Sequence, residues 1–135
     1  MTKEQAIKTA VKWWSDKLRS RARHDNGDTS VSSLFACALA DQLSKPITDE
    51  QLEVFEAELT KILEVEIDNH WYILLMVDYD PCKMLYDAAK AAGISEHNFP
   101  YKTNVHIENK GGNGYYTVKV SDGYAQPYVE LYPVV

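Results

Sequence analysis

The spacing of the apolar residues changes near residue 70, and this change constrains the fold more than any other feature of the chain. Up to about residue 66, apolar side chains recur every three or four positions, which is typical of amphipathic helices. After about residue 100 they alternate with polar ones, which is typical of half-buried strands. We therefore expect a single α+β domain over residues 1–135, with a helical part at 1–66 and a strand, helix and sheet part at 70–135.

Three helices are predicted in the first part. Thr2 and Thr48 each begin a T-x-x-Q pattern, which is typical of a helix start and predicts helices over about 3–21 and from residue 48 to the Asp68-Asn69 turn. Between them, Thr29 or Ser30 caps a helix that ends near Leu43. That helix is rich in apolar and small residues, so we expect it to be largely buried.

The second part is expected to form a small antiparallel or mixed sheet that helices cover on one face. The apolar run from Trp71 to Tyr79 favours a buried central strand. Asp80 and Pro81 are typical of a helix start, and Gly93 of a helix stop. Prolines bracket the last strand, which favours an edge position. Three strands follow the fourth helix, at about 102–108, 115–120 and 128–132.

Charge is distributed in blocks along a chain whose net charge is −6. Residues 1–27 hold seven lysines and arginines against three acids, a net charge of +4, whereas residues 47–80 hold ten acids and one lysine, a net charge of −9. One interpretation is that the basic and the acidic helix lie side by side and neutralise each other. Two others are an acidic face that docks on a partner's basic groove, and a basic patch that binds nucleic acid.

The motifs exclude several classes of protein. No catalytic or cofactor signature of high specificity is present, which favours a protein that is not an enzyme and binds no cofactor and no metal. The longest apolar run is too short to cross a bilayer, and no basic-then-apolar signal opens the chain. Cys37 and Cys82 match neither a disulfide framework nor a metal site, so we expect a protein of a reducing cytosol without membrane contact.

Three groups of residues are candidate sites. The first is a carboxylate array on the third helix, which would dock on a basic partner: Glu50, Glu53, Glu56 and Glu64. The second is a basic patch at the end of the first helix, which would contact phosphates: Arg19, Arg21 and Arg23. The third is a pocket of a small enzyme or nucleotide-binding protein, at the end of the first strand: His70, Asp78, Asp80 and Cys82.

The last third of the chain is rich in tyrosine. Tyrosines on strands usually pack across the sheet, but a face that no helix covers is also good interface material. The sequence therefore also predicts self-association through this sheet. The tyrosines concerned are Tyr115, Tyr116, Tyr124, Tyr128 and Tyr132.

Several short segments of the chain resemble small proteins encoded by phages and prophages of Gram-positive bacteria, a group without an established common mechanism. The segments are Trp13-Trp14 with Leu18-Arg19, Asp25-Asn26-Gly27-Asp28, Val77-Asp78-Tyr79-Asp80-Pro81-Cys82, Ala88-Ala89 to Ala92-Gly93-Ile94, Phe99-Pro100-Tyr101-Lys102-Thr103 and Gly123-Tyr124-Ala125-Gln126-Pro127. The resemblance implies a mobile-element accessory protein that binds a host protein or protein–nucleic acid complex stoichiometrically. Such proteins include inhibitors of host defence, as anti-CRISPR proteins are.

Overall fold

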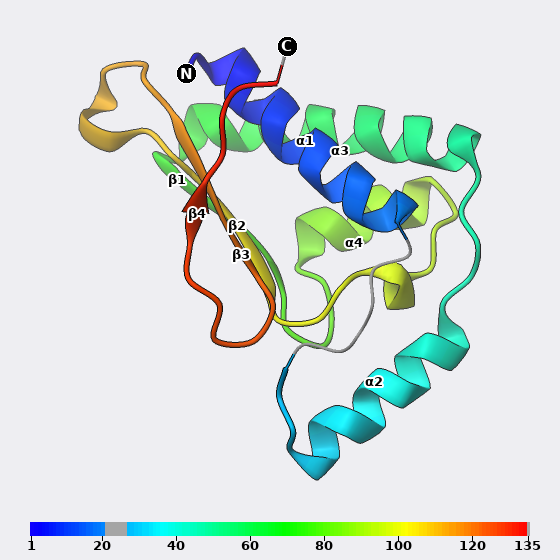
Figure 1. Cartoon of the computed structure of the whole chain (residues 1–135). Coiled ribbons are helices and arrows are strands. Elements are labelled where there is room, and N and C mark those ends of the chain that lie inside the picture. The colour runs from blue at the N-terminus through cyan, green and yellow to red at the C-terminus, as the bar shows by residue number, and fades with distance from the viewer. Residues whose placement is uncertain (21–26, 135) are drawn as a thin grey trace.

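A layer of helices covers one face of a four-stranded antiparallel sheet in the computed structural model, which describes residues 1–20 and 27–134 (Figure 1). This arrangement confirms the predicted α+β fold. The elements are α1 (Lys3–Arg19), α2 (Val31–Leu43), α3 (Asp49–Asn69), β1 (Tyr72–Val77), α4 (Lys83–Ala91), β2 (Thr103–Glu108), β3 (Thr117–Asp122) and β4 (Val129–Glu130), with short 3₁₀ turns at η1 (Glu96–Asn98) and η2 (Lys110–Gly112).

Both predicted capping boxes are present. The Thr2 hydroxyl accepts a hydrogen bond from the Gln5 amide at 3.2 Å, and the Gln5 side chain accepts one from the Thr2 amide at 2.9 Å. Thr48 and Gln51 repeat the exchange at 3.1 and 2.9 Å. These bonds satisfy amides that the first helical turn leaves without partners, and so they fix where α1 and α3 begin.

The hydrophobic core lies between the covered face of the sheet and helices α1, α3 and α4. α1 and α4 contact the sheet, and α3 packs along both of them. Trp14, Phe55 and Phe99 meet at the centre, with ring centroids 5.9 Å apart for Trp14 and Phe99 and 6.1 Å apart for Phe55 and Phe99. Each such buried side chain contributes about 2–3 kcal/mol by leaving water. The core therefore holds α1 and α3 in fixed positions.

The strand order is β1-β2-β3-β4, so β1 is an edge strand. The prediction of a buried central strand from Trp71 to Tyr79 is wrong. Along β1, Ile73 and Leu75 face the core, whereas Met76 on the other face is 41% exposed. An unbroken apolar run looks buried on both sides, but half of its side chains here lie on the open face of the sheet.

The start of α4 also differs from its prediction. Cys82, not Asp80, is the N-cap residue, and its side chain makes no capping hydrogen bond. Pro81 forms an isolated bridge with Val77 and precedes the helix by two residues. The Cys82 amide donates to the Met76 carbonyl at 2.8 Å, which folds the chain back on β1 before the helix can begin.

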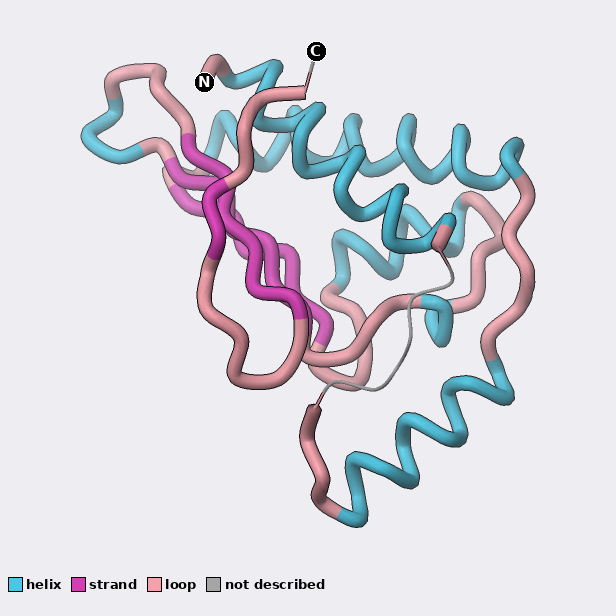
Figure 2. Tube along the Cα trace, in the orientation of Figure 1, coloured by secondary structure: helices cyan, strands magenta, loops and turns pink. Residues whose placement is uncertain are grey.

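Helix α2 is not the largely buried helix that its composition predicts. It stands apart from the other helices (Figures 1 and 2), and its contacts are concentrated on η1. Its small residues Ser33, Cys37 and Ala40 face the body, whereas Val31 and Phe35 are 84% and 71% exposed. Small side chains allow close approach to the irregular segment at η1, so the large apolar side chains are left on the outer face.

Candidate functional site

Helices α1 and α3 lie antiparallel and are joined by polar contacts at both ends. Lys3 Nζ lies 2.6 Å from Asp68 Oδ1, and Arg19 Nη1 lies 2.8 Å from Asp49 Oδ1. Between these pairs, the Ser15 hydroxyl donates to Glu56 Oε1 at 2.6 Å. The basic and the acidic helix are therefore neighbours, and part of their charge is compensated between them.

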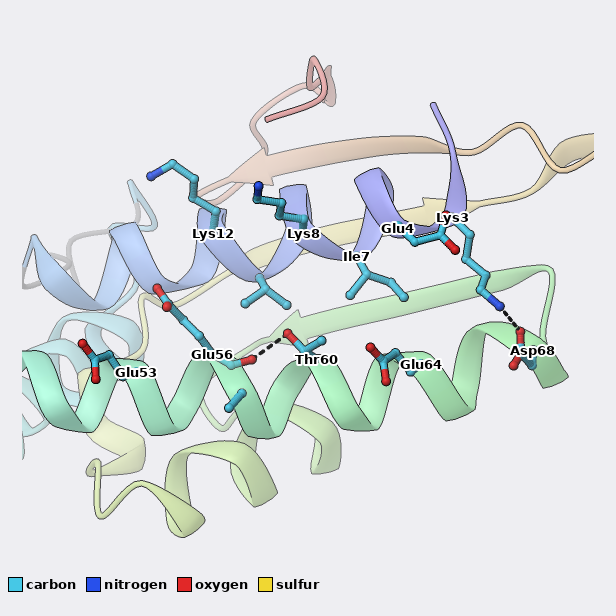
Figure 3. A pocket seen from close by; sticks show the side chains of 12 residues that line it. Lys3, Glu4, Ile7, Lys8, Lys12, Glu53, Glu56, Thr60, Glu64 and Asp68 are labelled. Atoms are coloured by element: carbon cyan, nitrogen blue, oxygen red, sulfur yellow. Dashed lines mark hydrogen bonds and ion pairs between the residues drawn. The ribbon is translucent and has the colours of Figure 1, made fainter. Parts of the chain in front are cut away.

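A groove with a volume of about 860 Å³ runs between these two helices (Figure 3). Its floor is apolar, because Ile7 and Val11 of α1 and the small side chain of Ala57 on α3 line it. The complete lining is Lys3, Glu4, Ile7, Lys8, Val11, Lys12, Glu53, Glu56, Ala57, Thr60, Glu64 and Asp68. An apolar floor between charged walls is suited to binding an amphipathic surface.

The two walls of the groove carry opposite charges. Glu53, Glu56 and Glu64 stand along α3, and Lys8 and Lys12 stand along α1 (Figure 3). Lys12 forms its ion pair with Asp16 of its own helix, at 3.2 Å. Glu53 and Glu64 are exposed, and their side chains make neither an ion pair nor a hydrogen bond with any residue in the described ranges. The α3 wall therefore presents carboxylates that the fold does not neutralise.

The structure brings together three of the four predicted carboxylates. Glu53, Glu56 and Glu64 line the groove, whereas Glu50 is exposed in the first turn of α3, beyond the lining. Positions 53, 57, 60 and 64 follow the three- and four-residue spacing that keeps side chains on one face of a helix. The lysine wall opposite them was not recognised as part of this site, since sequence spacing does not show which helices become neighbours.

The predicted basic patch lies mostly outside the described residues. Arg21 and Arg23 fall in the segment 21–26, which the structure does not describe. Arg19 is described, and its guanidinium is already engaged by Asp49.

The predicted pocket residues occupy both ends of β1. His70 precedes the strand, and its Nε2 lies 3.4 Å from Glu66 Oε2. Asp78, Asp80 and Cys82 follow the strand, so a six-residue strand of about 20 Å separates them from His70. The structure therefore groups the last three residues and leaves His70 apart.

Asp78 is held in a local ion pair at this strand end. It accepts a hydrogen bond from Lys102, whose Nζ also lies 4.5 Å from the centre of the Tyr79 ring. The hydrogen bond to Asp78 raises the pKa of Lys102, because the carboxylate stabilises the ammonium form. Asp80 is exposed and the free thiol of Cys82 is half-buried.

A cluster on the open face of the sheet escaped prediction. His106 Nδ1 is hydrogen-bonded to the Tyr72 hydroxyl, and His106 Nε2 to the Tyr128 hydroxyl at 2.7 Å. Burial lowers the pKa of His106, because it disfavours the charged imidazolium. The alternation of residues 102–108 placed His106 on the polar face of its strand, but the pairing of strands β1 and β2 was needed to find Tyr72.

One tyrosine of the tyrosine-rich segment is buried and the other four are exposed. Tyr116 is buried, and its amide donates to the Met1 carbonyl at 2.8 Å. Four tyrosines of the predicted surface are exposed: Tyr115, Tyr124, Tyr128 and Tyr132. The exposed apolar side chain of Trp71 precedes β1 at the edge of the same sheet.

Within residues 1–20 and 27–134, no three side chains of His, Cys, Asp or Glu are grouped as metal ligands would be. In the same ranges, no helix has both the length and the apolar character that crossing a bilayer requires.

No protein-family model and no curated protein sequence matches this chain.

Proposed function

We propose that this chain is a non-enzymatic binding protein that acts stoichiometrically, through the acidic face of α3, on a basic surface of a partner. The observation that carries the proposal is the pair of exposed, uncompensated carboxylates, Glu53 and Glu64, beside an apolar groove floor. Carboxylates arranged in this way steer a basic partner during encounter and fix its register once bound. Glu50 and Glu56 extend the same acidic face along the helix.

The partner that fits best is a host protein, or a protein–nucleic acid complex, with a groove built to bind phosphates. A surface lined by Lys and Arg for nucleic acid accepts a row of carboxylates in place of the phosphate backbone. The resemblance to phage and prophage proteins supports a role as an inhibitor of a bacterial defence complex, of the anti-CRISPR kind, in the cytosol of the host. In this role one copy blocks one target, and no turnover is required.

Self-association through the tyrosine-rich sheet is a second part of the proposal. Trp71, Tyr124 and Tyr132 are large exposed side chains of the kind enriched at protein interfaces. Tyr132, at 90% exposure, makes almost no contact with its own chain. A homodimer formed through this face would leave the acidic face of α3 free for the host partner.

The experiment is a pull-down from host lysate with the tagged protein, at low and at moderate salt, in which bound proteins are quantified by mass spectrometry. The double variant Glu53→Lys, Glu64→Lys should lose the complex, because it replaces two attractions with two repulsions. The matched control is Glu130→Lys, Asp80→Lys, which changes the net charge equally at exposed positions away from α3.

A stoichiometric host complex that weakens with salt, survives in the control and is lost in the double variant supports the proposal. A complex that the double variant retains at full strength would show that the acidic face is not the docking surface.

A further inference from the structure

We infer that the groove between α1 and α3 receives an amphipathic helix of the partner, with a cationic flank along α3 and an anionic flank along α1. This inference rests on the proposed function and specifies what binds at its site. Three observations support it: the length of the groove, the hydrogen bonding of the α1 and α3 backbones within their own helices, and the charges on the two walls.

The length of the groove sets the length of its occupant. The lining of α3 extends from Glu53 to Asp68, which are fifteen positions apart and so span about 22 Å of helix. The Lys3–Asp68 ion pair bridges the two helices at one end (Figure 3), and the Arg19–Asp49 pair bridges them beyond the other. An occupant of about fifteen residues, or four helical turns, fills this space.

Both walls of the groove are α-helices, and this favours a helical occupant. The backbone groups of α1 and α3 are already used inside their own helices, so the walls offer no backbone donors or acceptors with which an extended peptide could pair. An extended segment would leave its own backbone unpaired against the apolar floor, which is costly. A helix satisfies its backbone internally and can lay an apolar stripe on Ile7, Val11 and Ala57.

The charges on the walls specify the flanks of that helix. Lysines or arginines on one flank meet Glu53, Glu56 and Glu64 of α3. Acids on the other flank meet Lys8 and Lys12 of α1. Turning a helix end over end in the groove exchanges its two flanks, so the order of the flanks decides the direction in which the occupant lies.

The test uses three synthetic peptides of about fifteen residues that share one apolar stripe. The first has one basic and one acidic flank, the second has two acidic flanks and the third has two basic flanks. Binding to the full chain is measured by fluorescence anisotropy of labelled peptide. The split-flank peptide should bind most tightly, and the peptide with two acidic flanks about tenfold more weakly, because it repels the α3 wall.

Reversing the α3 wall should reverse this preference. In the Glu53→Lys, Glu64→Lys variant the two new lysines balance Glu56 and Asp68, the acids that remain on the α3 wall, and the lining as a whole becomes net basic. The peptide with two acidic flanks should therefore become the tightest binder. The Glu130→Lys, Asp80→Lys control should keep the original order. Circular dichroism and thermal melting establish that each variant remains folded.

The second part of the test fills the groove with a larger side chain. Ala57 is exposed on α3, so Ala57→Trp fills the floor without disturbing the core, and Ala57→Ser is its matched control. The tryptophan variant should lose peptide binding and the serine variant should keep it. Equal binding of all three peptides, or unchanged binding to Ala57→Trp, would overturn the inference.

The inference and the proposed function fail in different ways. Peptide binding in the expected order, together with a host complex that survives in the Glu53→Lys, Glu64→Lys variant, supports the helix-binding groove and overturns the proposed function. A host complex that is lost in that variant but kept by Ala57→Trp supports the acidic face and overturns the helical occupant.

Discussion

At the scale of single residues, Trp14 is the largest fully buried side chain of the described core. It is fully buried, and its indole N–H has no hydrogen-bond partner among the described residues. Trp14→Ala should lower the free energy of unfolding by about 3–5 kcal/mol, because it opens a large cavity. Trp14→Phe should cost less than about 2 kcal/mol, since it keeps an aromatic ring and removes the unpaired donor.

Chemical denaturation of the two variants measures this difference. Equal losses would show that the indole N–H is satisfied and that Phe leaves as damaging a space as Ala does.

Through His106, the free energy of unfolding should depend on pH. Burial lowers its pKa below the 6.5 of an ordinary histidine, so the unfolded chain binds the proton more readily than the folded one. Its contribution to stability is complete above pH 6.5 and is lost as the pH falls from there through the lowered pKa. The difference in unfolding free energy between the wild type and His106→Gln should therefore shrink between pH 7.5 and pH 5.

Denaturant titrations at the two pH values, with NMR of the imidazole to follow its protonation, provide the measurement. The comparison with His106→Gln removes the effect of the many surface carboxylates, because both proteins share them. A difference that stays constant with pH, or grows towards pH 5, would contradict the predicted direction.

At the scale of elements, the start of α3 depends on one hydroxyl. Thr48→Ala removes the acceptor for the Gln51 amide and should cost about 1 kcal/mol of stability. Thr48→Ser keeps that acceptor and should stay within about 0.5 kcal/mol of the wild type. Thermal melting of the pair tests the capping box, and a Ser variant as unstable as the Ala variant would show that the methyl group matters instead.

Helix α2 should tolerate changes on its large apolar face and resist changes on its small one. Phe35→Ser alters an exposed side chain and should change stability by less than about 0.5 kcal/mol. Ala40→Leu forces extra volume into a buried position and should cost about 1–3 kcal/mol. Denaturation of both variants compares the two faces, and a larger effect at Phe35 would mean that its ring is buried in solution.

Whether the sequence predicted a feature depends on how far apart along the chain the interacting residues lie. The boxes at Thr2 and Thr48 involve residues three apart, so local spacing was enough to find them. The edge position of β1 and the outward face of α2 depend on which distant segments become neighbours, and periodicity does not carry that information. For the same reason Glu53 and Glu64 were predicted as acidic surface, but their groove with Lys8 appeared only when α1 was placed beside α3.

At the scale of the whole molecule, the exposed aromatic face predicts a change of mass with concentration. The chain has a mass of 15.4 kDa, and self-association should raise the mass measured by sedimentation as concentration rises. The variant Tyr124→Ser, Tyr132→Ser should keep the monomer mass throughout, because it removes two aromatic side chains of the proposed interface. Both side chains are exposed, so the fold itself should not change. Phe35→Ser is the matched control, since it removes an exposed aromatic ring elsewhere. A dimer lost only in the Phe35 variant would assign the interface to α2.

Segments that lie far apart in the sequence hold each other in place. The Met1 carbonyl accepts from the Tyr116 amide at 2.8 Å, and the Val134 amide donates to the Thr9 hydroxyl at 3.2 Å. During synthesis, α1 therefore leaves the ribosome long before the strand and the tail against which it packs exist. Its contacts with that strand and tail therefore form only after those segments have been made. Docking of these late segments on α1, rather than formation of any one helix, then completes the fold.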